Sequence, residues 1–358
     1  MPTGAQRGTQ AGAGRRAADT RVAPRGRPPA MTDVADFAGV SHQTVSRVLN
    51  DHPSVSPRTR ALVLAAVEQL GYRPNTAARA LATGRSRTLG VLSMSGTLFG
   101  PAATLSGVQA AAREAQYAVT VVDLASTEPL VLRQSAGLLV RQGVDGIILI
   151  APTTSSADAL VEAAGGLPLV AVEGQPEGDV AVVSVDQQAV GRLATQHLLD
   201  AGHATVWHVT GPLGFFEADG RVAGWRAALT AAGAEVPPPL SGDWSPRSGY
   251  EAGRVLARMD DVTAVFAGND QMALGLLRAL GEQGRRVPED VSIVGVDDIP
   301  EAAYFSPPLT TVRQDFAEVG RLSMAAVLRQ IDTGVPDTDR VVLAPELLTR
   351  CSVAPPRT

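Results

Sequence analysis

The chain has 358 residues, with 31 basic side chains that are all arginine, 36 acidic ones and a single cysteine, Cys351. This length exceeds one ordinary small domain, so we expect two or three units with a large buried core. One cysteine excludes an internal disulfide, and every apolar run is shorter than the roughly 20 residues that span a bilayer. These features predict a cytoplasmic protein that makes no membrane contact.

The charge is divided unevenly along the chain. Residues 1–87 hold 13 arginines against 5 acidic residues, a balance of +8, so the remainder holds 18 against 31, a balance of −13. Phosphate contacts dominate the affinity of proteins for nucleic acids. A basic N-terminal part on an acidic body therefore predicts that the N-terminal part alone binds a polyanion.

The first predicted elements are a disordered arm and a pair of short helices. Residues 1–28 are rich in Ala, Gly, Arg and Pro and show no hydrophobic period, which predicts a disordered basic arm. The stretch "MTDVADFAGVSHQTVSRVLN" then predicts two helices that cross at a glycine-containing turn, a helix-turn-helix. The pattern consists of Val34, Ala35 and Ala38 on the first helix, Gly39 at the turn, Ser41 as the N-cap, and Val45, Val48 and Leu49 on the second helix.

A third helix is predicted between Ser56, as its N-cap, and Gly71, which stops it. Its inner face is predicted to hold Leu62, Ala66 and Leu70. These helices complete a DNA-binding unit over residues 29–74. Residues 75–87 predict a hinge helix and linker, and at about nine residues this helix is too short to be stable in water unless something holds it.

After residue 87 the pattern alternates between apolar strands and Ala-rich amphipathic helices. Near-continuous apolar strands joined by helices predict parallel sheets covered on both faces, the doubly wound α/β class. The predicted strands are "TLGVLSM", "YAVTVVDL", "GIILI", "PLVAV", "VWHVT", "TAVFAG" and "VSIVGVDD".

The second helix of a helix-turn-helix enters the major groove with its N-terminal residues facing the bases. His42, Gln43 and Arg47 are placed for this role, since Gln suits adenine and Arg suits guanine. Thr44, Ser46 and Asn50 are short polar groups suited to phosphates. Nonspecific attraction is assigned to the arm and to Arg58, Arg60, Arg73 and Arg79. The alternative is a solvated pair of helices with ordinary polar residues.

Several polar residues follow predicted strands, where ligands bind in open α/β sheets. Glu173, Asn269 and Asp297 lie at such ends, and Arg221 follows a loop after "VWHVT". Carboxylate, amide and guanidinium groups match the hydroxyls of a sugar, and Trp244 offers a flat apolar face for its ring. Taken singly, the aspartate could instead be part of a turn or cap, the arginine part of a surface ion pair, and the tryptophan a half-buried core ring.

The string "DVADFAGVSHQTVSRVLN", followed by "VSPRTR" and "GYRPNTAARALATGRSRTLGV", resembles the N-terminus of the lactose-repressor (LacI/GalR) family of bacterial transcription regulators. The similarity continues to about residue 352. It implies a homodimer bound to double-stranded, palindromic operator DNA, with hinge helices paired in the minor groove. By this match Tyr72 and Asn75 join the DNA contacts, and Leu81 is the leucine that wedges into the central base step.

In the core, "RVAGW", "NDQMALG" and "DVSIVGVDD" are more similar to the lactose-repressor branch than to the purine or ribose branches. The resemblance implies a small sugar effector, a galactoside in that branch, between two periplasmic-binding-protein-like subdomains. It places these subdomains at 88–185 plus 315–343 and at 186–314 plus 344–352, with a tail at 353–358. The implied effector contacts are Arg221, Asn269 and Asp297 for hydroxyls, Trp244 and Phe316 for the apolar wall, Gln314 at the crossover, Leu98 and Gly100 at the lip, and Glu173.

The chain departs from the family pattern at three places. Glu173 stands where the family has Asp, which changes the reach of that carboxyl, and Ala30 stands where the family has a capping Thr. The chain ends in "CSVAPPRT" with no leucine heptad behind it, so we expect a dimer rather than a tetramer.

Three alternatives stay open at this point. The regulator could respond to a different sugar or act with a co-repressor. An extracytoplasmic sugar-binding protein shares such a core, but the DNA-binding segment and the lack of an export signal argue against it. An enzyme is disfavoured because the chain has no G-x-S-x-G, no phosphate loop and no metal-binding spacing among its five histidines. We therefore expect no catalytic residue, no cofactor and no metal.

Overall fold

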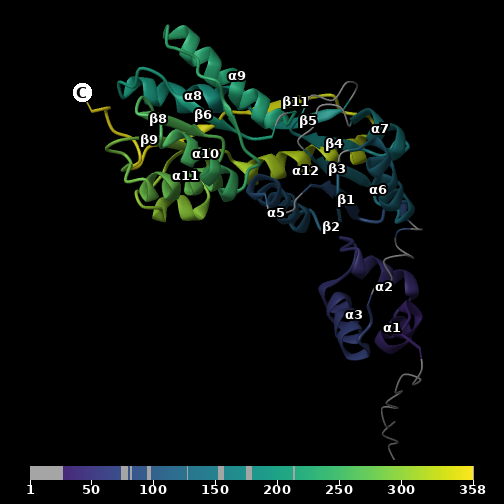
Figure 1. Ribbon diagram of the computed structural model, residues 1–358. Helices are drawn as coiled ribbons and strands as arrows, with labels where there is room; N and C mark the ends of the chain where they lie inside the picture. Colours follow the sequence, from purple (N-terminus) through teal and green to yellow (C-terminus); the bar gives the residue numbers. More distant parts are fainter. Residues whose placement is uncertain are drawn as a thin grey trace, which may run out of the picture. The chain divides into compact units, whose positions relative to one another are not determined.

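The computed structural model describes residues 27–73, 80, 83–94, 98–126, 128–151, 157–174, 180–212 and 214–357. The chain divides into two compact units, residues 1–84 and 85–358; the helices of the first are purple to dark blue in Figure 1, and the second runs from blue through green to yellow. Residues 1–26 of the predicted basic arm and most of the predicted hinge, including Asn75 and Leu81, lie outside the described residues. None of the described helices is long and apolar enough to cross a membrane.

The first unit consists of three helices around a small apolar core. They are α1 (Met31–Ala38), α2 (His42–Leu49) and α3 (Pro57–Leu70). Both predicted serine caps form, because the Ser41 hydroxyl accepts from the Thr44 N–H at 3.1 Å and the Ser56 hydroxyl accepts from the Thr59 N–H at 3.2 Å. The core consists of Val34, Ala35, Val45, Val48, Val63, Ala66 and Tyr72.

Helix α1 begins without the threonine cap of the family. The Asp33 carboxylate instead accepts from the backbone N–H of Ala30 at 2.7 Å and pairs with Arg27 at 2.9 Å. An acidic group in the first turn also favours the positive end of the helix dipole. The start of this helix is thus fixed from its first turn.

The prediction for the inner face of α3 is wrong at one residue. Leu62 is 50% exposed, and Val63 is buried in its place. Residues 62, 63 and 64 are all apolar, so periodicity could not decide which of them faces inward. Val63 and Ala66 are three residues apart and share the face that packs against α1 and α2.

The second unit begins with a sheet of six parallel strands in the order β11-β5-β4-β3-β1-β2. Helices α5 (Phe99–Glu114) and α12 (Phe316–Thr333) cover one face, and α6 (Pro129–Arg141) and α7 (Ala157–Ala164) cover the other. The strands are β1 (Thr88–Ser93), β2 (Ala118–Asp123), β3 (Gly146–Ile150), β4 (Leu169–Val172), β5 (Ala181–Val185) and β11 (Arg340–Leu343).

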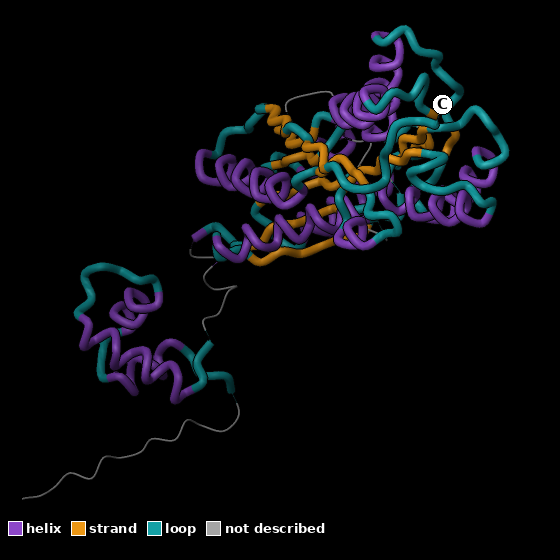
Figure 2. The backbone as a smooth tube through the Cα atoms, turned by 90° about the vertical axis from the view of Figure 1, so that its left-hand side faces the viewer, coloured by secondary structure: helices purple, strands orange, loops and turns teal. Residues whose placement is uncertain are grey.

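The other sheet has the order β12-β10-β9-β8-β6-β7, with β12 antiparallel to β10. Helices α8 (Gln187–Asp200) and α9 (Phe216–Ala231) cover one face, and α10 (Pro246–Leu256) and α11 (Asp270–Glu282) cover the other. Figure 2 shows the strands in orange between layers of helices in purple. The remaining elements are β6 (Trp207–Thr210), β7 (Leu240–Ser241), β8 (Ala264–Ala267), β9 (Ser292–Asp297), the 3-10 turn Pro300–Tyr304, β10 (Thr310–Arg313) and β12 (Glu346–Leu348).

The chain passes between the two sheets three times, at residue 186, at residues 314–315 and at residues 344–345. The doubly wound α/β prediction is therefore confirmed, and each of the seven predicted strands forms. The short strands β7, β10, β11 and β12, together with β5, were not predicted. Most of these lie toward the edges of the sheets, where a strand needs fewer apolar residues.

Each of three helix pairs in this unit packs through glycines that face each other's backbone. A Cβ at Gly191 of α8 would lie 2.1 Å from the Arg221 carbonyl oxygen, and one at Gly224 of α9 would lie 2.0 Å from that of Gln188. The same arrangement occurs between α10 and α11, and between α5 and α12. These contacts let the helix backbones approach closely on both sheets.

Candidate functional site

The exposed face of α2 is the candidate nucleic-acid interface. His42, Gln43 and Arg47 are exposed, while Val45 and Val48 point into the core on the opposite face. Thr44 and Ser46 are half-buried, and Asn50 is an exposed C-cap residue. The six predicted contact residues of this helix therefore lie at or beside one accessible face, and four of them are exposed.

The helix ends hold three of the short polar side chains in place. The Thr44 hydroxyl lies 2.9 Å from that of Ser41, and the Asn50 amide donates to the Ser46 carbonyl at 2.9 Å. Tyr72 is only 7% exposed and packs in the core, so little of its side chain is accessible to DNA. Arg60 pairs with Asp51, which reduces the charge that it offers to phosphate.

A second candidate site is a cavity of about 650 Å³, its open mouth included, between the two sheets. The nine side chains predicted to bind an effector line it together, although they come from positions between residues 98 and 316. The polar residues at the carboxyl ends of β4, in one sheet, and of β8 and β9, in the other, meet there because both of these sheet edges border the cavity. The lining consists of Leu98, Phe99, Gly100, Pro101, Thr104, Ile150, Ala151, Val172, Glu173, Gln187, Phe215, Glu217, Arg221, Trp244, Asn269, Asp297, Gln314 and Phe316.

A chain of hydrogen bonds links four buried polar side chains in this cavity. The Arg221 Nε donates to the Gln187 side-chain oxygen at 3.0 Å, and the Gln187 amide donates to the Gln314 oxygen at 2.8 Å. The Gln314 amide in turn donates to the Asp297 carboxylate at 2.7 Å. Because Gln187 follows the first crossover and Gln314 lies in the second, these hydrogen bonds join the lining to the segments that connect the sheets.

The guanidinium of Arg221 is fixed by two further contacts. It donates to the Gly268 carbonyl at 2.6 Å, and its carbon lies 5.3 Å from the centre of the Trp244 ring. Asn269 caps α11 and donates to the Trp244 carbonyl at 3.1 Å. Phe316 meets Phe99 edge-on with the ring centres 5.9 Å apart. The cavity therefore has a polar side and an aromatic side.

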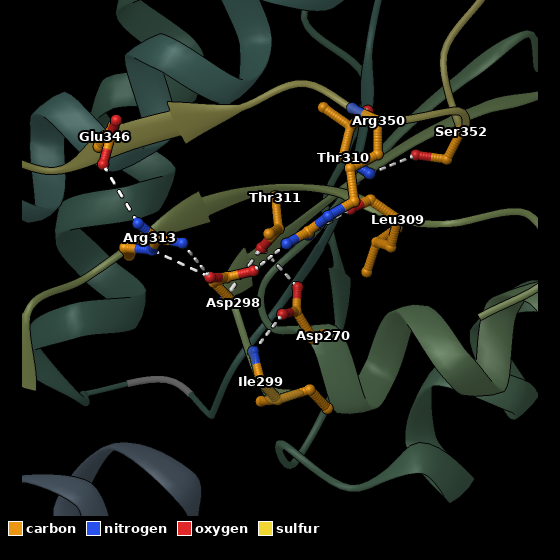
Figure 3. A network of polar contacts seen from close by, with 10 residues as sticks. All are labelled: Asp270, Asp298, Ile299, Leu309, Thr310, Thr311, Arg313, Glu346, Arg350 and Ser352. Atoms are coloured by element: carbon orange, nitrogen blue, oxygen red, sulfur yellow. Dashed lines mark hydrogen bonds and ion pairs between the residues drawn. The ribbon is translucent and has the colours of Figure 1, made fainter. Parts of the chain in front are cut away.

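Asp297 is held in an unusual backbone conformation, with φ at 104°. Its neighbour Asp298 accepts from Arg313 at 2.8 Å and from Arg350 at 2.5 Å (Figure 3). Left-handed backbone at a residue other than glycine costs free energy and persists only where the surroundings enforce it. These two arginines fix the chain directly after Asp297.

Asp270, the first residue of α11, fixes the same loop from behind. Its carboxylate accepts from the Thr311 hydroxyl at 2.6 Å and from the backbone N–H of Ile299 at 3.0 Å (Figure 3). Burial, together with the nearby charge of Asp297, raises the pKa of Asp270. The strand end that carries Asp297 is thus fixed by groups on β10, α11 and the C-terminal segment.

Two glutamates in the cavity have strongly raised pKa values. Burial and the nearby charge of Glu217 raise the pKa of Glu173 to about 8, and burial raises the pKa of Glu217 to about 7. Burial also raises the pKa of Asp297 to about 6, although Arg221 and Gln314 oppose this. Removing a carboxylate from water favours its protonated form, so this wall of the cavity resists full ionisation.

Sequence reasoning missed three polar members of the lining, Thr104, Gln187 and Glu217. Glu217 lies four residues before Arg221 on α9, so it faces the same side, and this spacing could have revealed it. Gln187 follows β5, a strand that was not predicted. Among the described residues there is no group of three or more His, Cys, Asp or Glu side chains that could hold a metal ion.

A three-helix unit with an exposed polar helix, joined to a core with a ligand-sized cavity between two parallel sheets, defines a ligand-responsive DNA-binding regulator. The lactose operon repressor of Escherichia coli K12 is 34% identical over 336 residues, which is 93% of this chain and 92% of that protein. The chain belongs to the lacI family of bacterial regulatory proteins. The sequence model of this family matches residues 30–75. A family of periplasmic binding protein-like domains matches residues 195–353.

Two further similarities agree with this membership. The ribose operon repressor of Escherichia coli K12 is 33% identical over 90% of this chain and 99% of that protein. A crystal structure of the lac repressor dimer bound to operator and the anti-inducer ONPF has a TM-score of 0.82 at 32% identity, covering 92% of this chain and all of that chain. Membership in this family makes the chain a transcriptional regulator and not an enzyme.

Proposed function

We propose that the chain acts in the cytoplasm as a homodimeric repressor of a carbohydrate-utilisation operon, released from a palindromic operator by a small sugar in the cavity. The observation that carries this proposal is that nine effector residues expected from scattered segments line one cavity between the sheets. A ligand that contacts both sheets can favour one relative orientation over another, provided that its affinity differs between the two. Relatives similar to nearly the same extent are named for lactose and for ribose, so similarity leaves the sugar open.

Each group of predicted residues has a role in this proposal. His42, Gln43 and Arg47 read base edges, while the remaining DNA contacts are Thr44, Ser46, Asn50, Tyr72, Asn75 and Leu81. Two half-sites about one helical turn apart require a symmetric dimer. Arg221, Asn269 and Asp297 hold hydroxyls, and Glu173 is a further polar contact. Trp244 and Phe316 form the apolar wall, Gln314 lies at the crossover, and Leu98 and Gly100 form the lip.

The proposal also assigns residue ranges to the DNA-binding domain, the linker and the two subdomains of the core. Residues 29–74 bind DNA, and residues 75–87 connect them to the core. The subdomains are 88–185 plus 315–343 and 186–314 plus 344–352, which follows the distribution of the strands between the two sheets. Rotation of one sheet against the other would then bend the chain near residues 186, 314 and 344.

The substitution Arg221→Ala tests this function directly. We expect the variant to bind operator DNA like the parent protein. Its release should require a sugar concentration at least about 10-fold higher, since one guanidinium holds several hydrogen bonds. Arg226→Ala is the matched control, because Arg226 lies on the same helix and is exposed. Gel-shift titrations with the DNA upstream of the gene and a panel of small sugars give the measurement.

Loss of operator binding by the Arg221 variant, with an unchanged melting temperature, would contradict the assignment of this residue to the effector. Sugar that strengthens operator binding would instead identify a co-repressor. Turnover of a chromogenic glycoside by the parent protein would overturn the regulator proposal for the cavity.

A further inference from the structure

The effector cavity holds more negative than positive groups. Glu173, Glu217 and Asp297 contribute three carboxyls, and Arg221 is the one cation in the described lining. With every group ionised, the lining would carry a formal charge of −2. A neutral ligand would leave this imbalance unchanged, and an anionic ligand would increase it.

The arginine is committed to other partners. Arg221 donates to the side-chain oxygen of Gln187 and to the carbonyl of Gly268, and it lies over the Trp244 ring. Its charge lowers the pKa values of Glu173 and Glu217, but burial has the larger effect on both. The arginine therefore orients the polar side of the cavity without neutralising the two glutamates.

One oxygen of each glutamate lacks a partner. Oε2 of Glu173 and Oε2 of Glu217 are shielded from solvent and accept no hydrogen bond from the residues that the structure describes. The other oxygen of Glu173 accepts from the backbone N–H of Val185 at 3.0 Å, so the position of this carboxyl is fixed. Buried polar atoms without partners are rare in folded proteins, and each needs an explanation such as a missing ligand.

The two unpartnered oxygens belong to side chains that line the same cavity. The charge of Glu217 is also one cause, after burial, of the raised pKa of Glu173. A protonated amine offers three N–H donors and one positive charge, whereas a hydroxyl offers one donor and no charge. A single ammonium group could therefore donate to both oxygens and remove their mutual repulsion.

We propose that the effector is an amino sugar, whose ammonium group lies between Glu173 and Glu217 while its hydroxyls face Arg221 and Asn269. This inference rests on the proposed function and narrows its ligand class. Trp244 and Phe316 provide the apolar faces for the carbon side of the ring. Glu217 is then the residue that separates amino sugars from neutral ones.

Isothermal titration calorimetry on the full-length protein tests this at about pH 6.5, where aliphatic amines are protonated. The probes are the 2-amino-2-deoxy and 6-amino-6-deoxy derivatives of D-glucose and D-galactose. Each is compared with its parent hexose and its N-acetylated form, which share the ring but carry no charge. We expect at least one amine to bind at least about 10-fold more tightly than both neutral matches.

Glu217→Gln preserves the shape of the side chain and removes its charge. We expect this variant to reduce the preference for the amine to less than about threefold. Glu235→Gln is the matched control, because it removes an exposed carboxylate outside the lining. Glu173→Gln is the second variant, and it should reduce the preference in the same direction.

Proton release provides a readout that packing alone would not change. Because the cation favours the ionised carboxyls, binding should release protons, so the affinity for the amine should rise between about pH 5.5 and pH 7. Titrations in buffers with different ionisation enthalpies count these protons. Binding of the parent hexoses should release fewer.

Two results would overturn the inference. One is a parent hexose or N-acetyl form that binds as tightly as the amine, and the other is a preference that survives Glu217→Gln. If a neutral sugar releases the operator and amines do not, this inference fails and the proposed function stands. If no saccharide of either kind changes operator binding or the melting temperature, both fail.

Discussion

Asp297, Glu173 and Trp244 line the same cavity and share a left-handed backbone, with φ values of 104°, 63° and 70°. Such conformations are unfavourable for side chains with a Cβ, and they cluster where function requires a particular direction. Around Asp297 the cause is visible, since buried hydrogen bonds and ion pairs hold Asp298 and Ile299 on its C-terminal side. The backbone that carries the ligand-facing carboxyl is thus fixed by residues outside the lining, while Gln314 in the lining holds the carboxyl itself.

The raised pKa values predict how stability depends on pH. Glu173 and Glu217 have pKa values of about 8 and about 7, above the roughly 4.3 of glutamate in unfolded chains. The folded state therefore binds more protons in this interval, so the stabilising contribution is full below about pH 4 and is lost as the pH rises through 7 and 8. We expect the melting temperature of the ligand-free protein to fall by several degrees between about pH 6 and pH 9.

Glu217→Gln should flatten this dependence, because the amide does not titrate. Circular dichroism during thermal unfolding across the pH range gives the comparison. Two results would contradict the claim that burial raises the pKa values of Glu173 and Glu217. One is a melting temperature that rises toward pH 9, and the other is a variant whose melting temperature falls as steeply as that of the parent protein.

At the scale of elements, α2 depends on its N-cap. The Ser41 hydroxyl accepts from the Thr44 N–H and also contacts the Thr44 hydroxyl, next to Gln43 on the exposed face. We expect Ser41→Ala to destabilise this helix by about 1 kcal/mol and to weaken operator binding. Hydrogen exchange of the α2 amides in the full chain measures the first effect, and Gln43→Ala, which should alter base preference without faster exchange, is the control.

The helix pairs of the core depend on glycine contacts. A Cβ at Gly224 would lie 2.0 Å from the Gln188 carbonyl oxygen, so Gly224→Ala should separate α9 from α8 and destabilise the core by about 1 to 3 kcal/mol. Gly281 of α11 has no atom within 4 Å of its built Cβ, so Gly281→Ala should be neutral or stabilising by up to about 1 kcal/mol. Urea unfolding curves would contradict this account if the two variants were equally stable.

The elements differ in how well the sequence predicted them. Central strands such as Gly146–Ile150 form uninterrupted apolar runs, so their positions and the polar residues after them could be predicted. Leu62 was placed on the wrong face because its neighbours are also apolar, and Gln187 was missed because β5 was not recognised. The hydrogen bonds that join residues 187, 221, 297 and 314 depend on tertiary contacts that no local pattern contains.

At the scale of the whole molecule, charge and chemistry are divided between two units. The first unit, residues 1–84, carries a balance of +6 and the second carries −11, so the charge of the first unit favours a polyanion and that of the second does not. Regulation of DNA binding by a ligand requires both units, because the cavity lies in one and the DNA-binding helices lie in the other. The proposed function requires that the cavity and the DNA-binding helices share a free energy of coupling, which in allosteric proteins is typically about 1 to 3 kcal/mol.

Thermodynamic reciprocity tests this coupling most directly. If the effector lowers operator affinity by some factor, the operator must lower effector affinity by the same factor, which the typical coupling sets at about 5- to 150-fold. The measurement is calorimetric titration of the effector into the dimer, with and without saturating operator duplex, alongside operator titrations with and without the effector. We predict equal factors in both directions, and effector binding that is unchanged by the operator would contradict the account.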